Sequence, residues 1–398
     1  MIFLPKKTIA RCTFFSTILK NKILSILTLI LFINTSLLAC TGFYYSNGNI
    51  ALAGNSEDWI NPFSRIWVIP AEQNKFGGVY FGFSEGGIQG GINDQGLFYD
   101  GFATKSLKVI LSKDKETYTG DLVTKVMDEC RTVDEVITVF NKYNLQFMEK
   151  SMLFFGDKYG NSAIIEGDVI IRKKDSYQLT TNFYQSKESP DSITCLRYKA
   201  AKDIMSKTKK VDIDLIRRIL SDTHKEGKYP TQYSNIYDLK NGKIYLYHFH
   251  NYENLIELDI EEELKKRKHT IDLPSLFPKS NAALSYKNDI QEDMDKRFAE
   301  RKVIKINNDD YKKFAGVYEF DPNVMPGYTI EVSIEDNRLF VEISFLDRAE
   351  IFPESETNYF LVGTNETFEF IFMPESINNK TKLTAKMYGM EMEATKID

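Results

Sequence analysis

The chain has 398 residues, which is more than one hydrophobic core usually serves, so we expect two domains behind a leader. Its formal net charge is −5 at pH 7, and loss of the five basic residues of the leader would change it to −10. A negative charge of this size argues against nucleic acid and against anionic membrane surfaces as partners.

Residues 1–39 have the composition of an export signal. They contain no acidic residue, and an apolar run of eleven residues extends over Ile23–Ile33. A membrane-spanning helix needs about 20 apolar residues, so this run is too short to be one. The basic residues that precede it are Lys6, Lys7, Arg11, Lys20 and Lys22. The segment therefore predicts a signal peptide and an exported protein, either periplasmic or secreted.

The end of the leader allows two interpretations that exclude each other. Cleavage before Cys40 would leave a residue with both a thiol and a free α-amino group. An α-amino group titrates near ~8, so a useful fraction is unprotonated near neutral pH and can take the thiol proton. However, Leu37-Leu38-Ala39-Cys40 also fits a bacterial lipobox, in which the cysteine carries lipid. A free Cys40 would be a nucleophile, whereas a lipidated Cys40 would be a membrane anchor.

Strand-forming sequence begins directly after Cys40. Two β-rich runs are joined by Asn47-Gly48, which is the strongest short-range signal for a hairpin with a two-residue turn. With that turn, Cys40 lies opposite Asn55. The chain then leaves the sheet on the same side, which brings Asp58 within side-chain reach of Cys40.

Strands and helices follow in alternation up to residue 249. Strands are expected over 65–69 and 78–83, then a glycine-rich hairpin over 90–100, and two helices within 121–144, the second of which begins with a capping box at Thr132. Further strands are expected over 152–155, 162–165, 169–172 and 178–183, helices over 192–205 and 213–220, and strands over 234–239 and 243–249. This order is typical of an α+β domain with helices packed on sheets.

The last third of the chain has a different character. Residues 261–302 are highly charged and are expected to form helix and linker, and short alternating strands begin after about residue 307. Meanders of this kind form small barrels or sandwiches. We therefore expect a signal peptide over 1–39, a catalytic domain over 40–275, a charged helical linker over 276–306 and a β-rich accessory domain over 307–398.

Cys40, Asp58, Asn182 and Arg197, in this order, resemble the residue set of the N-terminal nucleophile (Ntn) hydrolases. Within that class the resemblance is to the linear amide C–N hydrolases, which include choloylglycine hydrolases and penicillin V acylases, and it extends from Cys40 to about His250. It implies an αββα sandwich, here followed by the small all-β domain. It also implies hydrolysis of a linear N-acyl amide, or acyl transfer, without a cofactor.

The resemblance implies a role for each of these residues. Cys40 would be the nucleophile, and Asn182 would donate a hydrogen bond to the oxyanion. Asp58 would orient the α-amine or the scissile N–H, and Arg197 would hold the aspartate or line the site. The expected partner is a small-molecule N-acyl amide.

Substrate contacts are expected from Asn55, Tyr99 and Asp100. Asn55 occupies the position at which some members of the class carry an arginine, three residues before the aspartate. A second amide donor of some members would fall near Ala103, whose side chain cannot donate, so a backbone N–H must serve there.

A rival interpretation is a lipid-anchored, non-catalytic binding protein that keeps the hydrolase fold and meets the membrane only through Cys40. An anchor cysteine usually precedes a flexible polar tether, whereas strand sequence begins here at once. The enzyme is therefore the favoured hypothesis.

His248 and His250 alternate on a predicted strand, so both would face the same side and could ligate a metal. No third ligand is evident at a suitable spacing, and no metal site is predicted.

Overall fold

The computed structural model describes residues 40–397, except residues 190, 209, 307–310, 323, 326 and 377–379. At residues 374–376 and 380 it describes the backbone alone. The predicted signal peptide lies outside the described residues. The described residues all belong to one compact unit, so the predicted division at 276–306 stays a prediction. Among the described helices, none is long and apolar enough to cross a membrane.

The first sheet is antiparallel and has the strand order β10-β1-β2-β11-β12-β13. Two of its inner strands, β1 and β2, are buried along their whole length. Cys40 directly precedes β1, and Asp58 is the last residue of β2. The six strands are β1 (Thr41–Ser46), β2 (Ala51–Asp58), β10 (Tyr177–Thr181), β11 (Thr231–Asp238), β12 (Lys243–His248) and β13 (Asn251–Asp259).

The second sheet has the strand order β14-β3-β4-β5-β6-β7-β8-β9. Aromatic side chains of its inner face meet those of the first sheet: Phe81 lies 6.1 Å from Tyr233, and Phe98 lies 5.0 Å from Tyr237, between ring centroids. Its strands are β3 (Ser64–Ile69), β4 (Gly78–Phe83), β5 (Gly87–Asn93), β6 (Leu97–Ala103), β7 (Ser151–Asp157), β8 (Ser162–Glu166), β9 (Val169–Arg172) and β14 (His269–Asp272).

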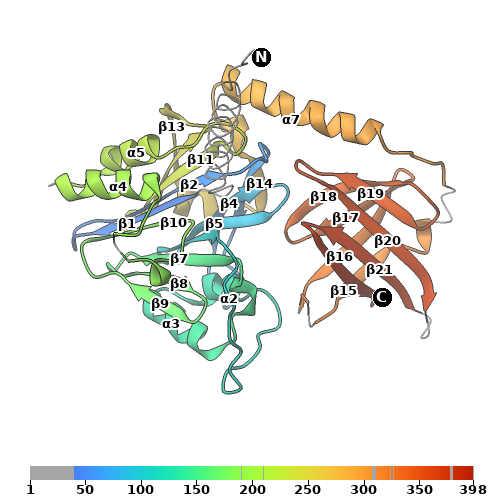
Figure 1. Cartoon of the computed structure of the whole chain (residues 1–398), viewed down its shortest axis with the longest axis horizontal. Helices are drawn as coiled ribbons and strands as arrows, with labels where there is room; N and C mark the ends of the chain where they lie inside the picture. The colour runs from blue at the N-terminus through green and yellow to red at the C-terminus, as the bar shows by residue number, and fades with distance from the viewer. Residues whose placement is uncertain are drawn as a thin grey trace, which may run out of the picture. The chain divides into compact units, whose positions relative to one another are not determined.

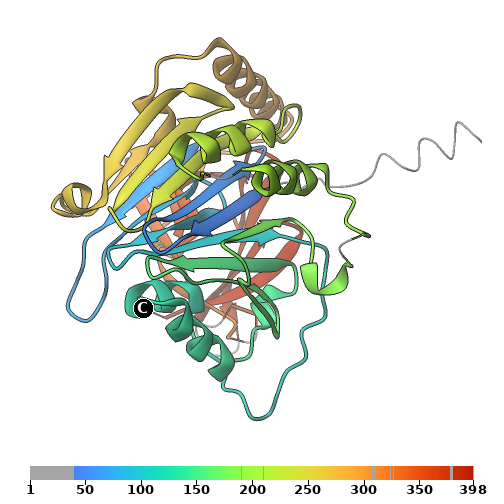
Figure 2. The same cartoon turned by 90° about the vertical axis from the view of Figure 1, so that its left-hand side faces the viewer.

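Helices cover the outer faces of both sheets (Figure 2). The apolar faces of α2 (Leu122–Glu129) and α3 (Val133–Lys142) pack on the second sheet, and α3 begins with the predicted capping box between Thr132 and Glu135. The first sheet is covered by α4 (Leu196–Lys207) and α5 (Ile213–Asp222). The resulting α-β-β-α layers confirm the predicted fold class. Shorter helices are η1 (Gln146–Met148), η2 (Gln185–Lys187), α6 (Ile260–Leu264) and η3 (Leu273–Leu276).

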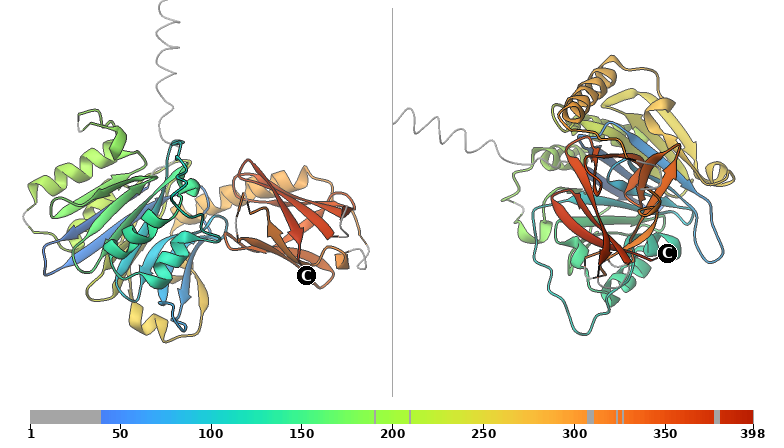
Figure 3. Two further views of the ribbon diagram at one scale, coloured as in Figure 1. Left: turned by 90° about the horizontal axis from the view of Figure 1, so that it is seen from below. Right: turned by 90° about the vertical axis from the view of Figure 1, so that its right-hand side faces the viewer.

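The C-terminal strands close into a barrel in which each strand pairs with the next one along the chain (Figures 1 and 3). Helix α7 (Asn281–Ala299) precedes it in the charged segment. The barrel encloses an apolar core formed by its own side chains and by those that directly precede it. Its strands are β15 (Gly316–Phe320), β16 (Thr329–Glu335), β17 (Arg338–Ile343), β18 (Leu346–Pro353), β19 (Asn358–Val362), β20 (Thr367–Ser376), β21 (Lys380–Met387) and β22 (Met390–Lys396).

The β1–β2 hairpin does not have the predicted register. Ser46 pairs with Ala51 and Thr41 with Ser56, so the connection is longer than the two-residue turn expected from Asn47-Gly48. The side-chain Oδ1 of Asn47 accepts hydrogen bonds from the backbone N–H groups of residues 49 and 50, at 3.1 Å each, and stabilises the longer loop. As a result Cys40 aligns with Glu57 and not with Asn55.

The two sheets approach closely at Gly42. An added Cβ there would lie 2.6 Å from Cζ of Phe102 and 3.1 Å from Cδ1 of Phe154, both rings of the opposite sheet. We expect Gly42→Ala to destabilise the protein by about 1–3 kcal/mol, because these two buried rings would have to shift inside the core to admit the methyl group. Urea denaturation would measure this change.

Gly54→Ala is the matched control on the neighbouring strand. Its Cβ would meet a side-chain methyl of Ile216 at 3.0 Å and no atom closer than that. We expect a smaller loss of stability, and equal losses for the two variants would contradict the close approach at Gly42.

Candidate active site

Cys40 immediately precedes β1 and is 8% exposed. Its thiol donates a hydrogen bond to Oε2 of Glu57, with 3.3 Å between the sulfur and the oxygen. The residue borders a cavity of about 410 Å³. The other residues that line the cavity are Glu57, Asp58, Trp59, Phe83, Glu85, Gly86, Gln89, Gly101, Ala103, Asn182, Met325, Phe345, Tyr388 and Met390.

Burial raises the pKa of the Cys40 thiol well above its usual value, and the nearby carboxyl groups of Glu57, Asp58 and Asp100 raise it further. The backbone N–H of Asp58 bonds to the sulfur and acts in the opposite direction. The thiol therefore stays protonated near neutral pH. A base must remove its proton before the sulfur can act as a nucleophile.

Asp58 ends β2 and lies next to Cys40. Its Oδ1 accepts a hydrogen bond from the Thr231 hydroxyl at 2.5 Å. Its Oδ2 is buried, has no hydrogen-bond partner among the described residues and lies 3.9 Å from Nη1 of Arg197. Burial raises the pKa of Asp58 to about 7, although the Arg197 charge opposes this shift. The site thus contains a carboxyl oxygen with an unused capacity to accept a hydrogen bond.

Arg197 lies in the first turn of α4 and reaches back to the nucleophile. Its Nη1 donates hydrogen bonds to the backbone carbonyl of Cys40 at 2.6 Å and to the hydroxyl of Thr41 at 3.0 Å. The guanidinium group therefore fixes the backbone of Cys40. It also makes an electrostatic contact with Asp58.

Asn182 follows β10, which pairs with β1 so that Thr181 is aligned with Thr41. This register brings Asn182 to the cavity near Cys40. Its Nδ2 donates a hydrogen bond to the backbone carbonyl of Ala103 at 2.9 Å, which fixes the direction of the amide. Because Nδ2 carries two hydrogens, the amide can make a second donation.

The three predicted substrate contacts have other positions. Asn55 is buried, and its Nδ2 donates to Oε1 of Glu57 at 3.1 Å and to Oδ1 of Asp100 at 3.3 Å. Tyr99 belongs to the core under α2 and α3, where its ring stacks 6.0 Å from that of Phe155. None of the three is among the described residues that line the cavity. The structure therefore brings together Cys40, Asp58, Asn182 and Arg197 but places these contacts behind the nucleophile or away from it.

Glu57 and Asp100 form a buried pair of carboxyl groups. Burial raises the pKa of both, and the two groups hydrogen-bond to each other. One shared proton avoids two buried charges at short distance, as is usual for carboxyl pairs. Asn55 connects the two side chains.

Several residues of the site were missed in the sequence. Glu57 contacts the thiol because of the unexpected hairpin register, and Thr231 lies before the predicted start of its strand. The barrel residues Phe345 and Tyr388 line the cavity although the β-rich part contains no candidate catalytic group. Residues 84–86 hold the barrel there: the N–H of Gly86 donates to the carbonyl of Phe345 at 2.8 Å.

Comparison with known proteins finds similarity to solved structures only. No family model and no curated protein sequence matches the chain. A penicillin V acylase from Agrobacterium tumefaciens is similar with a TM-score of 0.47 and 17% identity, over 58% of this chain and 91% of the acylase. Two variants of conjugated bile acid hydrolase from Clostridium perfringens each have a TM-score of 0.45 and 14% identity, over 58% and 59% of this chain and 96% and 98% of theirs.

Proposed function

We propose that the mature chain is an exported hydrolase of linear amides in which Cys40 is the N-terminal nucleophile. The observation that carries the proposal is the Cys40 thiol beside the unpartnered Oδ2 of Asp58, at the wall of a cavity. Cleavage before Cys40 would create an α-ammonium group, and this oxygen can accept a hydrogen bond from it. Asp58 would then hold the new terminus and orient it.

In the proposed reaction, the α-amino group of Cys40 accepts the thiol proton as the sulfur attacks the carbonyl carbon of the amide. Nδ2 of Asn182 donates a hydrogen bond to the oxyanion that forms. The α-ammonium group then gives its proton to the leaving amine, and the C–N bond breaks. Water hydrolyses the resulting thioester with the α-amino group as base, which releases the acid and restores the thiol.

The electrostatic surroundings fit a thiol that loses its proton only during the reaction. Three nearby carboxyl groups disfavour a resting thiolate, whereas the N–H of Asp58, which bonds to the sulfur, stabilises a transient one. A resting thiol is protected from oxidation in an exported protein, because the thiolate is the reactive form.

The cavity supports an apolar acyl group as the part of the substrate bound beside Cys40. Its described lining includes the side chains of Trp59, Phe83, Phe345, Tyr388 and Met390. Burial of an apolar chain against such side chains contributes about 25 cal/mol per Å² of apolar surface. We therefore propose N-acyl amides with apolar acyl groups as the substrate class.

The burial of the sulfur also bears on the lipid-anchor alternative. The Cys40 thiol faces Glu57 inside the fold, and β1 begins at the next residue. A lipidated sulfur has to reach a bilayer, which this position does not favour. The free N-terminal cysteine is therefore the proposal we retain.

The test is the intact mass and N-terminal sequence of protein purified from the exported fraction, followed by assays of amine release from N-acyl amides of increasing acyl length. We expect a chain that begins at Cys40 and hydrolyses amides, with KM falling as the acyl group lengthens. A diacylglyceryl mass on Cys40 would refute the mechanism and support an anchored binding protein.

We predict that Asn182→Ala lowers kcat by about 10²–10³-fold, because the oxyanion loses a preorganised donor. The measurement is steady-state kinetics of the mature protein on its best N-acyl amide. Asn254→Ala, at an exposed asparagine of β13, is the matched control and should retain full activity. Similar losses in both variants would remove Asn182 from the mechanism.

A further inference from the structure

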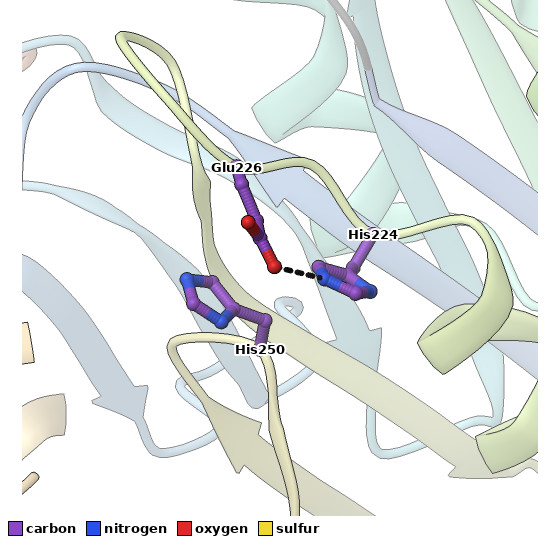
Figure 4. A group of neighbouring side chains, drawn as sticks. All are labelled: His224, Glu226 and His250. Atoms are coloured by element: carbon purple, nitrogen blue, oxygen red, sulfur yellow. Dashed lines mark hydrogen bonds and ion pairs between the residues drawn. The ribbon is translucent and has the colours of Figure 1, made fainter. Parts of the chain in front are cut away.

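A second group of side chains with metal-binding chemistry lies outside the cavity residues. It consists of His224, Glu226 and His250, each of which offers one ligand atom, and these atoms all lie within 4.8 Å of one another. Figure 4 shows the Glu226 carboxylate directed between the two imidazole rings. His224 and Glu226 follow α5, whereas His250 belongs to the turn between β12 and β13. Two separate segments therefore meet at this cluster.

The orientation of His224 suits a metal ligand. Its Nδ1 lies 2.5 Å from the backbone carbonyl of Ser221, which can only accept, so Nδ1 carries the proton. Nε2 is then the ring nitrogen left for another partner, and it lies 3.3 Å from Oε1 of Glu226. A carbonyl that fixes one ring nitrogen and leaves the other to the metal is the usual arrangement around metal-binding histidines.

His250 reaches the cluster through an unusual turn. Phe249 and His250 both have positive φ angles, of 47° and 20°, which cost conformational energy in residues other than glycine. The N–H of Phe249 donates to the carbonyl of Gln232 at 2.8 Å and holds the turn in place. The imidazole of His250 stacks on that of His224, with 5.2 Å between ring centroids.

This turn corrects the expectation that His248 and His250 face the same side of one strand. β12 ends at His248, whose ring packs 5.5 Å from that of Phe277, between ring centroids, and is not one of the three clustered residues. The partner of His250 is His224 instead, from a segment that the spacing of the two strand histidines could not indicate.

We propose that His224, Glu226 and His250 bind a divalent transition-metal ion, with Zn²⁺ as the best-suited metal. Two imidazoles and one carboxylate are a recognised ligand set for zinc, and the fourth position remains for water. Tetrahedral coordination at ~2.0–2.2 Å needs ligand atoms about 3.4 Å apart, so the cluster must contract slightly. Nε2 of His224 and Oε1 of Glu226 already lie 3.3 Å apart, and the Glu226 side chain is 73% exposed, so it can follow a shift of the His250 ring toward them.

Metal binding here would stabilise a segment that reaches the active site. Lys225, between the two ligands, donates its N–H to Oγ1 of Thr231 at 2.8 Å and accepts from the N–H of Thr231 at 2.9 Å. The same Thr231 hydroxyl donates to Asp58. A metal ion would therefore link the His250 turn to the segment that contains Lys225. This segment positions Thr231, which donates the hydrogen bond to Asp58.

The test is the binding of Zn²⁺ to tag-free mature protein, measured by competition with a chromophoric chelator. We expect one zinc ion per chain and a rise in the thermal midpoint on zinc addition. His250→Asn should weaken zinc binding by about tenfold or more. Loss of a residue that only hydrogen-bonds to a metal ligand already lowers metal affinity by about tenfold, and this variant removes a ligand itself. Asparagine tolerates a positive φ, so this variant should remain folded.

Two further variants complete the experiment. Glu226→Gln changes an exposed ligand and should also weaken binding, without risk to the fold. His269→Gln is the matched control at the fourth histidine of the chain and should bind zinc as the unchanged protein does. Equal zinc affinity in His250→Asn, Glu226→Gln and the unchanged protein would overturn the proposal. Because the measurement is binding alone, its outcome is independent of the amide-hydrolase proposal.

Discussion

Mature protein with Cys40→Ala should lose its N-acyl amide hydrolysis by about 10⁴-fold or more, while remaining folded. The loss should be this large because the sulfur forms the covalent intermediate and no second thiol is placed to replace it. Cys130 lies in the core under α2 and α3, and Cys195 lies before α4, where it accepts a hydrogen bond from Thr181. Steady-state kinetics and circular dichroism of the variant would measure both parts of the prediction.

Cys195→Ala is the control for this experiment, since it removes a partly exposed thiol near the site but not at the cavity. It should retain activity. If Cys195→Ala abolished hydrolysis and Cys40→Ala did not, the nucleophile would have been assigned to the wrong cysteine.

A chain that retains one residue before Cys40 separates the thiol from the α-amine. It keeps the sulfur and its hydrogen bond to Glu57 but has a peptide nitrogen in place of the amine. If the amine is the base, this extended chain should be as inactive as Cys40→Ala. Full activity in the extended chain would transfer the role of base to Glu57, the carboxyl group that contacts the thiol.

Local sequence features predicted most of the fold. The capping box at Thr132 and the apolar faces of α2 and α3 depend on residues three to four positions apart, and the structure reproduces both. The edge strands β13 and β14 were not predicted. β13 is largely exposed, so it lacks a clear apolar alternation, and β14 has only four residues.

The candidate site was harder to predict than the fold because it depends on register and on contacts between distant segments. The order of Cys40 and Asp58 suggested their proximity, but the side chain of Asn47 changed the hairpin loop and placed Glu57 opposite the thiol. His224 and His250 meet only because α5 and the turn after β12 lie together. No local pattern in the sequence contains this information.

The buried carboxyl group of Asp58 leads to the second large prediction, which concerns stability against pH. Burial raises the pKa of Asp58 from 3.8 to about 7 in the folded chain, whereas the unfolded chain keeps the lower value. Between these two pH values the folded state binds a proton that the unfolded state does not, so the free energy of unfolding falls as pH rises. A shift of this size corresponds to about 4 kcal/mol, all of it lost above pH ~7.

Asp58→Asn should remove this loss, because asparagine can still accept the Thr231 hydrogen bond but carries no charge to bury. We expect the variant of the extended, uncleaved chain to match the unsubstituted chain near pH 4 and to be more stable than it at pH 8. Urea denaturation at several pH values would measure the difference, and the titration of buried groups that do not interact with Asp58 cancels because both chains contain them. Parallel stability curves would show that Asp58 has an ordinary pKa.

In mature protein the difference in stability between the Asp58→Asn variant and the unsubstituted chain at pH 8 should be smaller, since an α-ammonium group beside Oδ2 favours the carboxylate and lowers the pKa of Asp58. The stability that the uncleaved chain loses at Asp58 would thus be recovered when cleavage creates the base for catalysis.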